Sequence, residues 1–144
     1  MRILSLIILL FLSGIGIAQG NVVQVSGTIK DDDTGKALDG ATIEVFQDGK
    51  LYETKTCASN GKIPLIDLPI GHNYAIYIKK TGYVTKMVTI NANFSHPEDL
   101  QPVIGQQLES ALFKTMEGID FSFLETIPMI EFQILEETGQ LGFD

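Results

Sequence analysis

Short runs of β-forming residues alternate with turn residues through the middle of the chain, and this pattern constrains the fold more than any other feature. In one run, Ile43 and Val45 alternate with Thr42 and Glu44, as in a strand with one buried face. Asp, Asn and Gly, which favour turns, separate the runs. No segment of this region keeps a helical period of apolar residues. The predicted strands are residues 22–29, 41–46, 51–58, 63–68, 74–79 and 83–90.

These runs predict an all-β fold, an antiparallel β-sandwich of about seven strands. The pair Asp48-Gly49 suits a tight hairpin turn. The seventh strand would come from residues 105–113, which the sequence allows to be either a strand or a short helix.

The first eighteen residues differ from the rest, because 13 of them are apolar. Met1 and Arg2 form a short positive start, and small residues end the apolar stretch at Ala18. We expect residues 1–18 to be a secretory signal peptide. The alternative is a membrane anchor, but residues 3–18 are 16 residues with two glycines, against roughly 20 needed to span a bilayer. The mature chain is therefore expected to lack a transmembrane segment and to be periplasmic, outer-membrane associated or extracellular.

The net charge of −8 is unevenly distributed. Residues 19–94 contain eight Lys and eight acidic residues, whereas residues 95–144 contain Lys114 against ten acidic residues, a net charge of −9. We therefore divide the mature chain into a β-sandwich domain, residues 19–94, and an acidic C-terminal segment, residues 95–144. The acidic balance argues against nucleic acid as a partner, because phosphate recognition needs a basic face.

Cys57 is the one cysteine of the sequence, so no intrachain disulfide can form. It lies in the predicted strand 51–58 and is expected to be buried filler, since a nucleophilic thiol also needs a base. His72 and His96 lie in predicted loops with no acidic partner at a diagnostic spacing.

A series of short motifs runs through residues 22–92. It comprises Val25, Gly27 and Ile29, the run from Asp33 to Ile43, Thr56, Asn60-Gly61, Ile63 and Leu65, Leu68-Pro69, Gly71, Tyr74 and Gly82-Tyr83. In order and spacing these motifs resemble the carboxypeptidase regulatory-like domain, which is a prealbumin-like β-sandwich. Ile63 stands where that family often has an aromatic residue. Leu68, Tyr74 and Tyr83 are candidates to fill the space between the sheets.

The acidic segment is similar to the continuation of this sandwich in secreted bacterial envelope proteins. Phe121 and Leu124 are expected to dock a short helical turn, and residues 130–143 to form a C-terminal β-hairpin. Proteins of this kind usually continue further, so the sequence is either a short version or part of a longer chain. The residues that fit the pattern are Leu112, Phe113, Gly118, Asp120, Phe121, Leu124 and Pro128.

The sequence lacks the catalytic residues of several enzyme classes. Neither histidine has a Glu three positions later, as metallocarboxypeptidases require. The terminal Tyr-Arg-Gly-Ser of transthyretin-like hydrolases is absent, and the mature chain contains no Arg for bidentate capture of an anion. We therefore predict that the chain is not an enzyme, and we assign no catalytic residue, no metal ligand and no cofactor.

Two ligand classes stay open. Asp31, Asp32 and Asp33 offer the carboxylate oxygens that Ca²⁺ prefers, although consecutive residues point in different directions and a solvated turn is the alternative. Exposed tyrosines stack on sugar rings in carbohydrate-binding modules of related shape. The candidates are Tyr52, Tyr74, Tyr77 and Tyr83, of which Tyr74 and Tyr83 are better explained as core residues.

These observations predict an exported, non-catalytic β-sandwich module that acts in cell-envelope structure or in protein–protein interaction. Recognition would use its loops or the edge of a sheet. The alternatives are a carbohydrate-binding module and an accessory domain of a larger envelope transporter or peptidase. The expected partner is another envelope protein or a glycan, and not nucleic acid.

Overall fold

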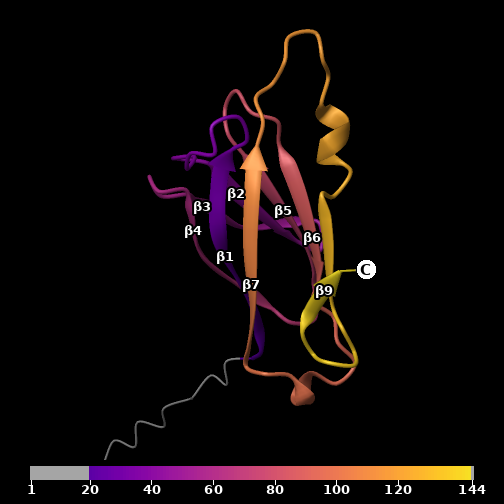
Figure 1. The fold of residues 1–144 in the computed structure, drawn as a ribbon. Coiled ribbons are helices and arrows are strands. Elements are labelled where there is room, and N and C mark those ends of the chain that lie inside the picture. Colours follow the sequence, from indigo (N-terminus) through magenta and orange to yellow (C-terminus); the bar gives the residue numbers. More distant parts are fainter. Residues whose placement is uncertain (1–19, 144) are drawn as a thin grey trace, which may run out of the picture.

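Two β-sheets face each other across one hydrophobic core in the computed structural model, which describes residues 20–143 (Figure 1). The smaller sheet has the strand order β4-β1-β7, and the larger has the order β3-β2-β5-β6-β8-β9. The strands are β1 (Val22–Asp31), β2 (Thr42–Gln47), β3 (Lys50–Thr56), β4 (Lys62–Pro69), β5 (Asn73–Lys79), β6 (Lys86–Asn91), β7 (Val103–Leu112), β8 (Ile130–Ile134) and β9 (Leu141–Phe143). Two short 3-10 turns are η1 (Pro97–Asp99) and η2 (Ser122–Glu125).

The all-β, prealbumin-like sandwich is confirmed, as are a helical turn at η2 and a hairpin of β8 and β9. The open question about residues 105–113 is settled by β7, which is a strand up to Leu112. The sheets are mixed rather than purely antiparallel, because β1 pairs in parallel with β7 and β6 pairs in parallel with β8. The predicted signal peptide lies outside the described residues. Between residues 20 and 143, no helix is long and apolar enough to cross a membrane.

The acidic C-terminal segment contributes strands to both sheets. β7 lies beside β1 in the smaller sheet, and β8 and β9 extend the larger sheet beyond β6. Ile104, Leu108 and Phe132 from this segment belong to the same buried cluster as residues of the first half. The change in charge near residue 94 therefore does not coincide with a break in the core.

The predicted alternation places the expected side chains in the core. Leu68 is fully buried and Tyr74 is 2% exposed, while Tyr83 is partly buried against the cluster. Cys57 is buried, and burial raises the pKa of its thiol, which agrees with a filling role. The largest fully buried aliphatic side chains are Ile29, Ile43, Ile66, Leu68, Ile76, Ile78, Ile90, Ile104 and Leu112.

One strand departs from the predicted alternation. The pairing of β1 with β4 shifts register between Val25 and Gly27, so the strand is bulged there. As a result Leu65 is 58% exposed whereas Ile66 is fully buried. Pro64 lies within β4, which is an edge strand where a missing backbone amide is tolerated.

At Gly27 the backbone of β7 leaves no room for a side chain on β1. Gly27 is paired with Leu108 and has a φ of +149°. A Cβ atom at this position would overlap the backbone oxygen and carbon of Leu108. Since neither backbone can move without breaking the pairing of β1 and β7, only glycine fits here.

We expect Gly27→Ala to lower the free energy of unfolding by about 3 kcal/mol or more, because the backbone clash separates two central strands. Urea unfolding measures this change. Gly105→Ala on β7 is the matched control, since a Cβ there meets no atom within 4 Å, and its effect should stay within about 1 kcal/mol. Equal effects of the two substitutions would contradict this role of Gly27.

Candidate functional site

A groove with a volume of about 1050 Å³ lies on the outer face of the larger sheet. One row of side chains, which crosses four strands, forms its floor. Phe46 on β2 is paired with Ala75 on β5, Ala75 with Thr89 on β6, and Thr89 with Glu131 on β8. The two small residues stand between two larger ones, and this size pattern hollows the face.

The two ends of the groove differ in chemistry. Toward one end, Tyr77 packs edge-on against Phe46, with ring centroids 5.5 Å apart and an interplanar angle of 80°. Toward the other end, Asn73, Asn91 and Gln133 form the next paired row across the sheet. An aromatic wall therefore faces an amide wall across the floor.

The charged residues of the groove favour ligands without negative charge. Glu131 lines it from β8 and Glu125 overhangs it from η2. Lys79 is the one basic residue of the lining, and its Nζ already pairs with Glu44 Oε2 at 3.0 Å and lies 5.6 Å from the Tyr77 ring centroid. A phosphate or carboxylate would meet unpaired acidic groups here and no free cation.

A histidine and an aspartate meet at the amide end. His72 Nδ1 lies 2.6 Å from Asp48 Oδ2, and the backbone N–H of Asn73 donates to Asp48 Oδ1 at 3.0 Å. The Asn73 amide, and then the His72 contact, lower the pKa of Asp48. A neutral imidazole that donates through Nδ1 keeps Nε2 as an acceptor. This pair can therefore accept a hydrogen bond from a ligand beside the groove.

The sequence did not indicate this pair, because 24 positions separate its members. The pairing of β2 with β5 places Gln47 opposite Tyr74, which brings the residues flanking those strands together. The Asp48–His72 pair could have been predicted only with knowledge of which strands are neighbours.

The four candidate tyrosines occupy different environments. Tyr77 lines the groove, and Tyr74 borders it with a buried ring. Tyr52 is exposed on β3 and packs edge-on against Tyr74. Of the four, Tyr77 therefore offers the groove an accessible aromatic surface.

The Asp31-Asp32-Asp33 run does not assemble a cation site. Asp31 ends β1 and is buried, where the Tyr83 hydroxyl donates to its Oδ2 at 2.6 Å and the Thr34 N–H to its Oδ1 at 2.9 Å. Asp32 and Asp33 are exposed in the following turn. The inward carboxylate is already bonded, so the three do not converge.

The hydrogen bond between Tyr83 and Asp31 should make the stability of the fold depend on pH. The Tyr83 hydrogen bond, followed by the Thr34 amide, lowers the pKa of Asp31. Because the pKa of Asp31 is lower in the folded state, its ionised form stabilises the fold at pH values above the ordinary carboxyl pKa of about 3.9. This contribution is lost as the pH falls through the lowered pKa. Tyr83→Phe should therefore lower the urea midpoint at pH 7, and this difference should shrink at acid pH.

Tyr52→Phe is the control, because the Tyr52 hydroxyl has only a long contact of 3.5 Å with Asp67 O. Its urea midpoint should match that of the unsubstituted protein at both pH values. A Tyr83→Phe effect of equal size at pH 7 and at acid pH would contradict the assigned bond.

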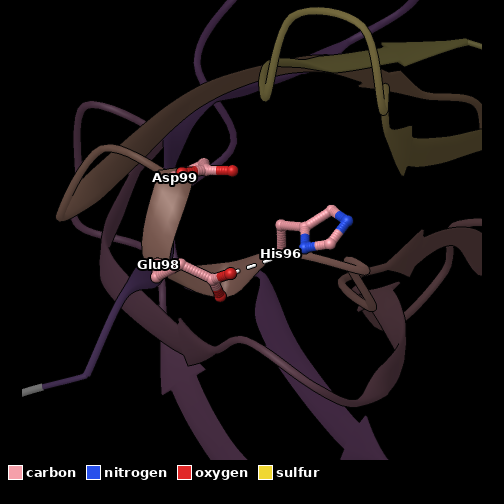
Figure 2. Close-up of side chains that lie close together, drawn as sticks. All are labelled: His96, Glu98 and Asp99. Atoms are coloured by element: carbon pink, nitrogen blue, oxygen red, sulfur yellow. Dashed lines mark ion pairs between the residues drawn. The ribbon is translucent and has the colours of Figure 1, made fainter.

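His96, Glu98 and Asp99 on and beside η1 form the one group of three possible metal ligands found between residues 20 and 143. Figure 2 shows the His96 ring and the Glu98 carboxylate turned toward each other, and His96 Nδ1 lies 3.4 Å from Glu98 Oε1. The donor atoms lie within 4.8 Å of one another, and imidazole with carboxylates suits a divalent transition metal. All three side chains are exposed, and the group includes no ligand from another element. We assign no function to it.

Comparison with solved structures reveals several likenesses of low sequence identity. A 3-chlorocatechol 1,2-dioxygenase from Rhodococcus opacus is 11% identical over 67% of this chain and 60% of its own, with a TM-score of 0.49. A 5-hydroxyisourate hydrolase from Klebsiella pneumoniae is 15% identical over 65% of this chain and 99% of its own, with a TM-score of 0.42. A Bacteroides uniformis protein to which carbohydrate binding is ascribed is 14% identical over 65% of this chain and 42% of its own, with a TM-score of 0.44.

No family model matches the chain, and no curated protein matches it. The resemblance to the carboxypeptidase regulatory-like domain therefore stays a prediction beyond the shared prealbumin-like sandwich.

The prediction that the chain is not an enzyme is contradicted. The similar solved structures include catechol dioxygenases and a hydrolase. The sequence argument rested on missing motifs of two enzyme classes, and such absences do not extend to other chemistry. At these identities the likenesses show the fold alone and do not establish this chain as an enzyme.

Proposed function

We propose that the protein is an exported binding module that holds a neutral glycan in the groove of the larger sheet. The observation that carries the proposal is the row Phe46, Ala75, Thr89 and Glu131, whose small central residues open a hollow between an aromatic wall and an amide wall.

The chemistry of these walls matches a sugar. A pyranose ring has apolar C–H faces, which pack on aromatic rings such as those of Phe46 and Tyr77. Its hydroxyl groups donate and accept hydrogen bonds, which suits the amides of Asn91 and Gln133 and the carboxylate of Glu131. Because the groove has acidic groups and one paired lysine, the glycan should carry no carboxylate or phosphate.

The sequence supports the cellular setting of this proposal. The expected signal peptide would deliver the mature chain to the cell envelope or beyond, where polysaccharides are abundant. The resemblance to a carboxypeptidase regulatory-like domain fits a module that assists a larger envelope assembly.

Affinity electrophoresis tests the proposal in gels that contain a neutral β-glucan, xylan or mannan, with alginate as the anionic comparison. We expect retardation by at least one neutral polysaccharide and none by alginate. Tyr77→Ala should weaken that binding about tenfold, equivalent to about 1.4 kcal/mol. Ala75→Trp, which fills the floor of the groove, should abolish it.

Tyr52→Ala is the matched control, because Tyr52 is an exposed tyrosine that does not line the groove. It should be retarded like the unsubstituted protein, and urea unfolding should show that all three variants fold. Retardation by no neutral polysaccharide would overturn the proposal, as would binding that survives Ala75→Trp.

A further inference from the structure

A second hollow, with a volume of about 780 Å³, lies next to the groove at one end of the larger sheet. Asn91, the last residue of β6, and Gln133 on β8 line both the groove and this second hollow. The other walls come from the turn between β4 and β5, the segment between β6 and η1, and the residues just before β1 and after β8. The amide wall of the groove is therefore also a wall of the second hollow.

Hydrogen bonds hold the amides on this shared boundary in place. Asn93 Nδ2 donates to Asn73 Oδ1 at 3.2 Å and to Asn91 Oδ1 at 2.8 Å, and the Asn93 N–H donates to the same Asn91 oxygen at 3.1 Å. Asn73 lines the groove, whereas Asn93 lines the second hollow. Because the oxygen of Asn91 accepts two bonds, the orientation of its side chain is set, and its Nδ2 group can donate to a ligand that crosses the boundary.

The second hollow repeats the chemistry of the groove. Phe94 and Ile70 are half-buried and offer apolar surface, and Asn93 offers an amide. The charged residues of its lining within residues 20–143 are Glu98 and Glu136, and none is basic. An aromatic ring, amides and carboxylates without a cation suit a neutral ligand rich in hydroxyl groups.

Bonds within the protein fix the walls of the second hollow. Asn21 Nδ2 donates to the carbonyls of Pro97 and Leu100 at 3.2 and 3.1 Å, which joins the residue before β1 to η1. Glu136 Oε1 accepts from Ser95 Oγ at 2.9 Å and from the Ser95 N–H at 3.2 Å. These bonds connect segments that are distant in sequence, so the hollow exists before a ligand arrives and little ordering is needed on binding.

The geometry of β5 relates the groove to the length of its ligand. From Tyr77 to Asn73 the strand advances four residues, or about 14 Å at about 3.4 Å per residue. Asn73 and Asn91 stand at the end of this path, and the second hollow continues beyond them toward Gly71. A short ligand stops at the amide boundary, whereas a longer one crosses it.

We propose that one neutral glycan chain occupies the groove and the second hollow together, so that the protein selects long chains over short oligosaccharides. The inference rests on the glycan binding proposed for the groove, and it adds the length of the ligand and the residues that read it. Phe94 packs on a sugar ring of the distal part of the chain, and Glu98 accepts a hydrogen bond from one of its hydroxyl groups.

Titration calorimetry tests this inference with oligosaccharides cut from the neutral polysaccharide that retards the protein. The trisaccharide serves as the short ligand and the hexasaccharide as the long one. We expect the hexasaccharide to bind at least tenfold more tightly than the trisaccharide. Tyr77→Ala should weaken the binding of both, because both occupy the groove.

Phe94→Ala removes the aromatic surface of the second hollow. It should weaken hexasaccharide binding at least fivefold and leave trisaccharide binding within twofold of the unsubstituted protein. Phe94→Tyr, which keeps the ring, should bind both ligands like the unsubstituted protein. Unchanged trisaccharide binding also shows that the variant is folded.

Glu98→Ala provides a second variant that does not touch the core, since Glu98 is exposed on η1. It should weaken hexasaccharide binding about fivefold and leave trisaccharide binding unchanged. Asp99→Ala is the matched control, because Asp99 is the exposed neighbour on η1 and does not line the second hollow. It should bind both ligands like the unsubstituted protein.

The outcomes separate this inference from the function on which it rests. If no neutral polysaccharide retards the protein, the proposed function and this inference are both wrong. If the trisaccharide and the hexasaccharide bind equally tightly, glycan binding stands and this inference alone is wrong. The same holds if Phe94→Ala and Glu98→Ala change the binding of both ligands equally, or of neither.

Discussion

The close backbone approach of β1 and β7 at Gly27 is the constraint on which the rest of the fold depends. The Leu108 backbone occupies the space that any larger residue at position 27 would need. This approach lets β7 pair with all ten residues of β1, so β1 becomes the central strand of the smaller sheet. Parallel strands need a long connection, and here that connection contains most of the larger sheet. The pairing of β1 with β7, which the glycine at position 27 permits, therefore joins the two halves of the sequence in one sheet.

The second parallel pair has a comparable effect on the larger sheet. β8 pairs with β6 and places Glu131 beside Thr89. Without β8 the row across the outer face would end at Thr89, and the groove would lack the carboxylate of Glu131 and the amide of Gln133. The segment that differs in charge from the sandwich thus completes both the core and the candidate site.

Local sequence patterns predicted where the strands lie, but not which strands are neighbours in the sheets. Alternation and the Asp48-Gly49 turn identified β2 and β3, but they did not indicate the bulge that shifts the register of β4. For Asp31 the sequence left a cation site and a solvated turn as alternatives, whereas the structure buries it and Tyr83, distant in sequence, donates to its carboxylate. The groove and the Asp48–His72 pair depend on the pairing of β2, β5, β6 and β8. Periodicity within a strand carries no information about which strand lies next to it.

The fold divides the excess negative charge of residues 95–144 between the two sheets. Glu131 and Glu125 line the groove of the larger sheet, whereas Glu109 is exposed on the smaller sheet. The glycan proposed for the groove would contact these carboxylates directly, so selection against anions would act at hydrogen-bond distance, where salt screens weakly. Raising the salt concentration should therefore leave glycan binding nearly unchanged.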